Sequence, residues 1–415
     1  MSCYSQVLEA VFHLSKKGGM NRSLSNIKRL CEIYNHPEKA YPTIHVAGTN
    51  GKGSVCTKIA ACLQEQGYRV GLYTSPHIAS FRERIRIDME MIAEEEIAPL
   101  FEEISSTLNQ ARIEATLFEV ATLLAFLYFQ KKQVEIAVIE TGLGGLWDAT
   151  NVIEPLVSVI TSIGYDHMDV LGPTLEDIGR AKAGIIKRGA PTVIGPDVSY
   201  SFMEKFAKES PLIQSAFQDQ DFDRENQETA RLALSMIRDS FPMSESCLAK
   251  GLLAKPSCRF ESHIREKEII LDVAHNGHGF ARLLINLPHR YPSHNYRFIV
   301  GFSKGKNIEE CAHLIEEKAF AVHLVGGEHP RLATVDEIAP AFKKKENLFR
   351  EVSLGEAVRR ALGIATEKPE ILVIAGSFFI MRDARKALGI EDPEDPCLWY
   401  DPCKIAPISY GAALL

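Results

Sequence analysis

Short runs of apolar and β-branched residues alternate with longer amphipathic stretches from about residue 41 onwards. The run at 136–140 is apolar up to its final glutamate, which is typical of a strand buried on both faces of a parallel sheet. The same pattern predicts strands at 44–47, 70–74, 156–163 and 191–194, and helices at 55–65 and 118–130. Strands that alternate with helices predict βαβ units and a parallel sheet.

A second series of this kind begins after Leu253 and predicts strands at 269–273, 297–300, 319–325 and 371–374. Pro256, Ser257 and Cys258 interrupt the pattern between the two series, so we predict a linker there. A chain of 415 residues is also too long for one ordinary core. We therefore predict an α/β protein with a doubly wound, mostly parallel, P-loop-type domain over 1–254, a smaller Rossmann-like domain over 255–390 and an irregular extension over 391–415.

The composition narrows the classes of protein to consider. A formal charge of −7 argues against a surface that coats nucleic acid. The nine cysteines include no CxxC pair, which favours buried thiols in a reducing cytoplasm over a disulfide framework. Residues 1–20 carry charges among their apolar positions, as an amphipathic helix does and a signal peptide does not. We predict a cytoplasmic protein with neither membrane nor nucleic-acid partners.

The sharpest local feature is a glycine-rich loop between a predicted strand and a predicted helix, formed by Gly48, Thr49, Asn50, Gly51, Lys52, Gly53 and Ser54. Backbone N–H groups at a helix N-terminus bind anions, and a lysine adds charge for phosphate oxygens. The loop departs from GxxxxGK[ST], because Val46 replaces the first glycine and Gly53 separates Lys52 from the hydroxyl. We predict nucleotide binding over the alternative of a plain surface turn.

Glu140 ends an apolar strand beside a second glycine turn. Ligand sites in doubly wound sheets lie at such strand ends, and a carboxylate there suits Mg²⁺, which prefers oxygen ligands. The alternative is that Glu140 only caps the helix that follows.

Further motifs follow in order along the chain: Thr74-Ser75-Pro76-His77, Thr116-Leu117-Phe118-Glu119, Gly142-Leu143-Gly144-Gly145, Asp148-Ala149-Thr150-Asn151, Asp166-His167, Lys182-Ala183-Gly184-Ile185-Ile186-Lys187, Arg259-Phe260-Glu261, Asp272-Val273-Ala274-His275-Asn276 and Gly376-Ser377. With the GTNGKGS loop, this ordered set resembles the Mur ligase family, and the folylpolyglutamate/dihydrofolate synthases in particular, over about residues 20–385. The resemblance implies an ATP-dependent ligase that joins L-glutamate to dihydropteroate, reduced folates or both through an acyl phosphate, and it implies a monomer.

The resemblance also implies roles for individual residues. It places two Mg²⁺ ions, with room for a monovalent cation, on Ser75, Glu140, His167 and a carbamate of Lys182. It assigns catalysis to Lys52, Lys182 and His275, and nucleotide binding to residues 48–54 with Arg259 and Asp272. It implies a pterin site at Thr116, Leu117, Phe118, Glu119, Trp147, Asp148 and Ala149, with the loop after His77 as a lid. The residues alone favour the alternatives, a solvated helix lysine for Lys182 and an ordinary hydrogen-bonded polar residue for His167.

The sequence departs from the family pattern at a few positions. Ala181 stands where the family usually has glutamate, Leu146 where it has arginine and Cys258 where it has glycine. The adenine-contacting asparagine of the family falls at Thr229, with Asn226 one turn earlier as a substitute. Three alternatives to the bifunctional enzyme stay open: a monofunctional folylpolyglutamate synthase, another Mur-type amide ligase that acts on a nucleotide-linked cell-wall sugar, and a P-loop switch that needs no amino-acid acceptor.

Overall fold

The computed structural model of the chain describes residues 22–327, 329–364 and 368–395, together with residues 4, 5, 7, 8 and 10. Residues 4, 5, 7, 8 and 10 are helical, and the rest of the predicted helix at 1–20 lies outside the described residues. The same is true of most of the predicted extension, from residue 396 onwards, and of Cys3, Cys397 and Cys403.

The first sheet has eight strands in the order β4-β3-β2-β5-β1-β6-β7-β8. Six of them are parallel: β1 (Thr43–Ala47), β2 (Val70–Tyr73), β5 (Ile136–Glu140), β6 (Val157–Ile160), β7 (Thr192–Ile194) and β8 (Leu212–Gln214). At one edge β3 (Ile85–Ile87) and β4 (Glu90–Met91) continue the sheet in antiparallel pairing. Strand β1 lies between β5 and β6, with Val46 beside Glu140 and Val159.

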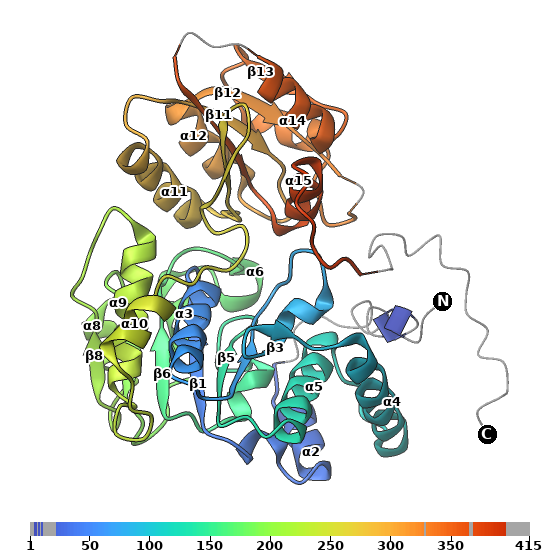
Figure 1. Cartoon of the computed structure of the whole chain (residues 1–415), viewed down its shortest axis with the longest axis vertical. Helices are drawn as coiled ribbons and strands as arrows, with labels where there is room; N and C mark the ends of the chain where they lie inside the picture. Colours follow the sequence, from blue (N-terminus) through green and yellow to red (C-terminus); the bar gives the residue numbers. More distant parts are fainter. Residues whose placement is uncertain are drawn as a thin grey trace, which may run out of the picture.

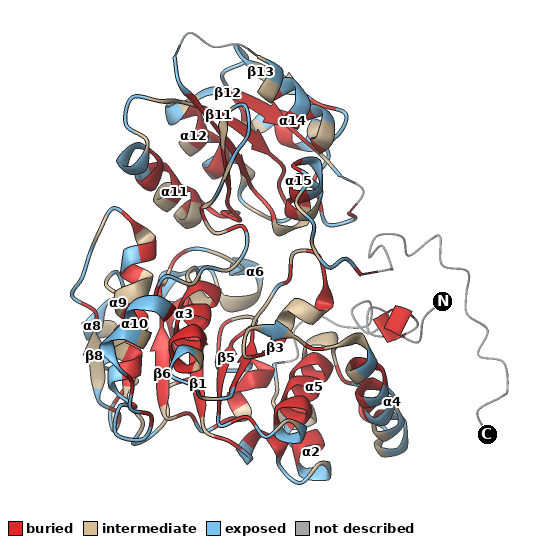
Figure 2. Cartoon of the chain, in the orientation of Figure 1, coloured by how far each residue is buried: buried red, intermediate tan, exposed pale blue. Residues whose placement is uncertain are grey.

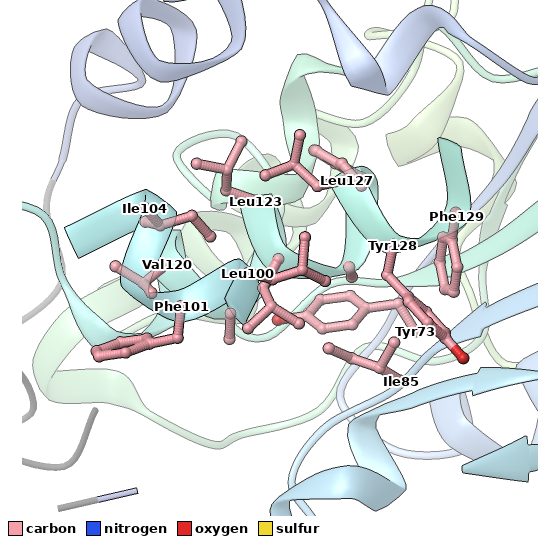
Figure 3. Close-up of a cluster of buried hydrophobic side chains, with 14 of the residues drawn as sticks. Tyr73, Ile85, Leu100, Phe101, Ile104, Val120, Leu123, Leu127, Tyr128 and Phe129 are labelled. Atoms are coloured by element: carbon pink, nitrogen blue, oxygen red, sulfur yellow. The ribbon is translucent and has the colours of Figure 1, made fainter. Parts of the chain in front are cut away.

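Helices cover both faces of this sheet. Along β5, Ile136 and Val138 pack into the core beneath α3, while Ala137 and Ile139 pack into the core beneath α5. This alternation explains why every residue of β5 is buried (Figure 2). Figure 3 shows the second of these cores between α4, α5 and the strands that carry Tyr73 and Ile85. The helices of this unit are α2 (Ser25–Ile33), α3 (Lys52–Glu65), α4 (Glu94–Ala111), α5 (Leu117–Lys131), α6 (Met168–Leu171), α7 (Leu175–Ala183), α8 (Tyr200–Met203), α9 (Phe222–Ser235) and α10 (Glu245–Gly251).

The second sheet has six strands in the order β13-β12-β11-β14-β10-β9, drawn in yellow to red in Figure 1. Its strands are β9 (Glu261–Ile264), β10 (Glu268–Leu271), β11 (Asn295–Val300), β12 (Ala319–Leu324), β13 (Leu348–Arg350) and β14 (Glu370–Ala375), and only β9 is antiparallel to its neighbour. Helices α11 (Gly277–Arg290) and α12 (Ile308–Lys318) pack on one face, and α14 (Leu354–Gly363) and α15 (Met381–Ala387) on the other. The short α13 (Val335–Ile338) follows β12.

The predicted fold class, two doubly wound and mostly parallel sheets, is confirmed. The predicted linker at 256–258 falls between α10 and β9. The strand predicted at 156–163 ends at Ile160, because Thr161 and Ser162 turn to bond the glycine-rich loop through their hydroxyl groups. The pattern missed β3, β4, β8, β9 and β13, each of two to four residues, because so short a run carries no periodicity.

Within the described ranges, none of the helices combines the length and the apolar character needed to cross a bilayer.

Candidate active site

The carboxyl ends of the parallel strands in both sheets border one cavity of about 700 Å³. The loops after β1, β2, β5 and β6 line it from the first sheet, and the loops after β10, β11, β12 and β14 line it from the second. A smaller cavity of about 90 Å³ adjoins it, and Asn50, Gly51 and Arg259 line both. Every site residue predicted from the sequence lines one of the two cavities: Ser54 and Asp272 the smaller, and the others the larger.

The glycine-rich loop is held against the end of β6. Thr49 donates its backbone N–H to the carbonyl of Ser162 at 2.9 Å, and Asn50 donates its own to the Ser162 hydroxyl at 3.0 Å. A Cβ on Gly48 would lie 1.9 Å from Thr161 Oγ1, so only glycine fits there. Gly51 begins α3 with φ of 84°, a left-handed conformation that also favours glycine. The loop therefore presents the N-terminus of α3 to the cavity.

Lys52 is the first residue of α3, and its side chain folds over the loop. Its Nζ donates to the carbonyl oxygens of Gly48 at 3.1 Å and Thr49 at 3.4 Å. The cation thus lies where a bound anion would meet both its charge and the free N–H groups of the helix.

Glu140 points toward this loop from the end of β5 and is only 2 % exposed. Its Oε2 accepts the backbone N–H of Ser75 at 3.0 Å, and a Cβ on Gly53 would lie 3.5 Å from the same oxygen. Burial raises the pKa of Glu140, and the charges of Lys52, Arg259 and Arg84 oppose that rise. A carboxylate with few protein partners, buried at the phosphate loop, is well suited to a divalent cation.

Asp166 links the end of β6 to the second sheet. It accepts a hydrogen bond from Asn276 Nδ2 at 2.8 Å, and its Oδ2 lies 3.3 Å from Nε2 of His275. Lys306 pairs with its other oxygen at 2.5 Å. Burial by itself would raise the pKa of Asp166, but His275 and the charge of Lys306 outweigh burial and hold it well below its usual range. The adjacent His167 is about half exposed, with 45 % of its side chain accessible.

Lys182 lies in the last turn of α7 and is 3 % exposed. The alternative of a solvated helix lysine is therefore wrong. Burial, with the charge of Lys52, lowers the pKa of Lys182 to about 7, so a large fraction of the amine is neutral near neutral pH.

Phe118 and Trp147 bring aromatic surface to the wall of the larger cavity. Trp147 is 44 % exposed, and Phe118 packs so closely over Gly142 that a Cβ there would lie 2.5 Å from its ring. The two nearby carboxylates are already bound within the protein. Glu119 accepts from the backbone and hydroxyl of Thr116 in the capping box of α5, and Asp148 accepts from Leu143 and Thr150.

Residues 46–235 match the Mur ligase middle domain, and residues 258–378 match the Mur ligase glutamate ligase domain. The dihydrofolate synthase/folylpolyglutamate synthase of Bacillus subtilis is 32 % identical over 420 residues, which cover 91 % of this chain and 97 % of that protein. The chain belongs to the folylpolyglutamate/dihydrofolate synthase family.

Solved structures agree with this assignment. The bifunctional folylpolyglutamate synthase/dihydrofolate synthase of Yersinia pestis, complexed with AMPPNP and a Mn ion, superposes with a TM-score of 0.85 at 29 % identity and covers 93 % of this chain and 98 % of its own. E. coli FolC in complex with DHPP and ADP has a TM-score of 0.84 at 27 % identity. The match covers 92 % of this chain and 97 % of that protein.

Two of the three departures from the expected family pattern, Leu146 and Ala181, lie in contact with each other. The backbone N–H of Leu146 donates to the carbonyl of Ala181 at 2.7 Å, beside Lys182. The third, Cys258, adopts φ of 57°, a left-handed conformation that favours the glycine expected here from the resemblance. Its backbone N–H donates to Glu261 Oε2 at 2.6 Å. A cysteine thus holds a backbone conformation that glycine adopts more readily.

Arg259 and Asp272 lie where the two cavities of this family member adjoin. The guanidinium of Arg259 lies over the ring of Phe378, 5.1 Å from its centroid. Asp272 accepts the backbone N–H of Phe260 at 2.9 Å and that of Ala274 at 2.8 Å, so it also ties the residue before β9 to the loop after β10. Two residues are candidates for contact with adenine. Thr229 donates its hydroxyl to the backbone carbonyl of Glu225 within α9, whereas the side chain of Asn226 faces Gly51 of the glycine-rich loop.

Four basic residues of the larger cavity escaped the sequence analysis: Arg84, Lys304, Lys306 and Arg331. Three of them come from the second sheet, in loops after β11 and β12. The signal for them was weak, because a lysine or arginine in a loop is usually solvated. Their place at the carboxyl ends of two predicted strands was the clue that could have found them.

Proposed function

We propose that the chain is an ATP-dependent ligase that joins L-glutamate to dihydropteroate, to reduced folates, or to both. The observation that carries this proposal is the arrangement of charge around one cavity. Lys52 and Glu140 from the first sheet and Arg259 and His275 from the second all line it. Such an arrangement suits a reaction in which a phosphoryl group passes between two bound substrates while water is kept out.

In this proposal an oxygen of the acceptor carboxylate attacks the γ-phosphorus of ATP, which forms an acyl phosphate and releases ADP. The amino nitrogen of L-glutamate then attacks the acyl carbon. The tetrahedral intermediate expels phosphate, the nitrogen loses a proton, and an amide remains. We assign Lys52 and Arg259 to the charge on the transferred group, and His275 to the incoming amino acid.

The residues around Glu140 fit a divalent cation that is shared with substrate. Among the described residues, no group of three or more His, Cys, Asp or Glu side chains is placed to hold a metal by itself. Glu140, the hydroxyl of Ser75 and His167 would hold one Mg²⁺ beside the loop, and the carbamate proposed for Lys182 would support the second. Mg²⁺ usually takes only one or two protein carboxylates, and phosphate oxygens and water complete its shell. When bound, it supplies charge neutralisation for the transferred phosphoryl group.

A carbamate on Lys182 is consistent with the burial of that side chain. Only a neutral amine attacks CO₂, and the lowered pKa of Lys182 makes the neutral form available. The product is an anion at the end of a long side chain, in a cavity wall whose carboxylates Glu119, Asp148 and Asp166 already accept hydrogen bonds from other protein groups. The positive charge of Lys52 nearby favours that anion.

The flat aromatic surface of Phe118 and Trp147 favours a pterin over a nucleotide-linked sugar. Because Glu119 and Asp148 are bound to their own loops, we assign ring recognition to stacking first. The bifunctional activity is supported by the relatives of this chain, while a monomeric state and a cytoplasmic location stay predictions of the sequence.

Phosphate release measured with dihydropteroate, a reduced folate and a cell-wall precursor separately, each with and without its amino acid, tests the proposal. We expect release with the pterin acceptors that requires L-glutamate for sustained turnover. Release with the cell-wall precursor and its amino acid, and with neither pterin, would indicate another Mur-type ligase. Rapid hydrolysis of ATP without any acceptor would indicate a P-loop switch.

A further inference from the structure

Asp395 follows the last helix of the second unit in the chain, but its side chain binds residues of the first unit. It is 3 % exposed. Its Oδ1 accepts the hydroxyl of Ser80 at 2.6 Å and that of Tyr4 at 2.8 Å, and its Oδ2 accepts the backbone N–H of Phe81 at 2.8 Å. A carboxylate that receives three hydrogen bonds in a buried setting fixes the groups that donate them. The sequence analysis attached no function to this part of the chain.

The segment that carries Asp395, residues 388–395, is fastened to α15, which Arg385 in turn ties to β9, and is called the strap below. Arg385 makes a bidentate pair with Asp392 at 2.5 and 2.9 Å, and it also pairs with Glu261 at 2.6 Å. Arg382 pairs with Glu394 at 2.5 Å. The strap therefore moves with the second sheet, and Figure 1 shows it descending from α15 toward the first.

The strap holds the loop that was predicted to act as the lid of the pterin site. Ser80 caps the short 3₁₀-helix Phe81–Arg84, and Glu83 binds the backbone of residues 78–80 from inside the loop. Ile78 packs against the core of the second sheet. The loop is thus compact by itself, and both Asp395 and Ile78 fix its position relative to the second sheet.

The loop carries side chains into the larger cavity. Ser75 and Pro76 precede it, and Arg84 ends its 3₁₀-helix; all three line the cavity. Arg84 Nε donates to His77 Nδ1 at 2.7 Å, which ties the two ends of the loop together. A shift of Ser80 and Phe81 would therefore move Arg84, whereas Ser75 stays held to Glu140 of the first sheet through its backbone N–H at 3.0 Å.

We propose that Asp395 is a positioning residue for the acceptor: it locks the lid loop through Ser80 and Phe81, so that the acceptor pocket is complete only when the strap is docked. This inference rests on the proposed function. It predicts that the strap affects binding of the pterin acceptor far more than binding of ATP, because the glycine-rich loop is held by Thr161 and Ser162 and not by the strap.

The test compares Asp395→Ala with Glu391→Ala in the full chain. Glu391 is an exposed residue of the same strap, which makes it a matched control. We expect Asp395→Ala to raise the KM for the pterin acceptor on the order of tenfold, with the KM for ATP changed by less than about twofold. Asp395→Asn keeps the volume and one acceptor oxygen, and should fall between the wild type and Asp395→Ala. Glu391→Ala should match the wild type.

Hydrogen exchange at the amide of Phe81 supplies a second readout that does not depend on the reaction. We expect faster exchange there in Asp395→Ala and no change in Glu391→Ala. Faster exchange with an unchanged acceptor KM would overturn the positioning role, and unchanged exchange would overturn the lock itself. If Asp395→Ala does not fold, Asp395→Asn with Ser80→Ala carries the same comparison. A wild-type chain that ligates glutamate to no pterin acceptor would refute the proposed function, while the exchange measurement would still test the lock.

Discussion

Asn50 of the glycine-rich loop donates from Nδ2 to Oδ1 of Asn276 at 3.2 Å. The two residues follow strands of different sheets, β1 for Asn50 and β10 for Asn276. Asn276 also caps α11 by accepting the backbone N–H of Gly279 at 2.7 Å, and it donates to Asp166 at 2.8 Å. One buried amide therefore joins the nucleotide loop, the end of β6 and the first turn of α11. In the proposed mechanism, we expect closure of the two units over substrate to depend on this contact.

Asn276→Ala should uncouple the two units while leaving the nucleotide loop intact. We expect kcat to fall by about tenfold through misalignment of the second unit, with a loss of stability of about 1 kcal/mol from the missing helix cap. Steady-state kinetics and denaturant unfolding measure the two effects. Asn307→Ala is the matched control, because Asn307 caps α12 in the same way but is exposed. Equal kinetic losses in both variants would refute the coupling.

Lys52→Ala should abolish turnover and leave the fold in place. The side chain donates its hydrogen bonds to carbonyl oxygens of its own loop, and Arg259, Arg84 and the backbone N–H of Ser75 still stabilise the charge of the buried Glu140 after its removal. We expect kcat to fall by about a hundredfold or more, through lost stabilisation of the transferred phosphoryl group. Phosphate release and thermal unfolding are the measurements, with the exposed Lys208→Ala as control. Near-normal ligation by Lys52→Ala would remove the role assigned to it.

The parts of the site that the sequence predicted are those encoded by contiguous residues. The glycine-rich loop and Glu140 follow directly from a strand and the turn after it. Glu119 shows the opposite case, because Thr116 and Glu119 have the spacing of a capping box, a signal that was present in the sequence but not used. The contacts of Asp166 with Asn276 and of Asp395 with Ser80 join residues 110 and 315 positions apart, and no local pattern encodes such pairs.

Lys182 should carry a carbamate in the active protein. Native mass spectrometry should show the added mass of one CO₂, absent from Lys182→Ala. Activity should fall when dissolved CO₂ is removed and return when bicarbonate is supplied, because carbamylation of a neutral amine is reversible. A wild-type chain that keeps full activity after thorough CO₂ removal, with no added mass, would contradict this prediction.

His45 should make stability depend on pH. It is fully buried in β1, with Nε2 2.8 Å from the Thr150 hydroxyl, and burial lowers its pKa to about 3. The unfolded chain takes up a proton below about pH 6.5 and the folded chain does not, so the contribution of His45 is present above that pH and is lost as the pH falls toward 3.

The slope expected from this one group is about 1.4 kcal/mol per pH unit within that window. Denaturant unfolding of the wild type and of His45→Gln between pH 6.5 and pH 4 measures the difference. Glutamine retains a hydrogen-bonding group for Thr150 but does not titrate. Parallel stability curves for the two proteins would show that His45 is not the source of the dependence.

The most direct test of the account follows one oxygen atom. If the acceptor carboxylate attacks the γ-phosphorus of ATP, then dihydropteroate labelled with ¹⁸O in its carboxylate must pass one labelled oxygen to the phosphate released during ligation of L-glutamate. Mass spectrometry of that phosphate should find one ¹⁸O per amide formed. Amide formation with unlabelled phosphate would contradict the acyl phosphate, and with it the roles proposed for Lys52 and Arg259.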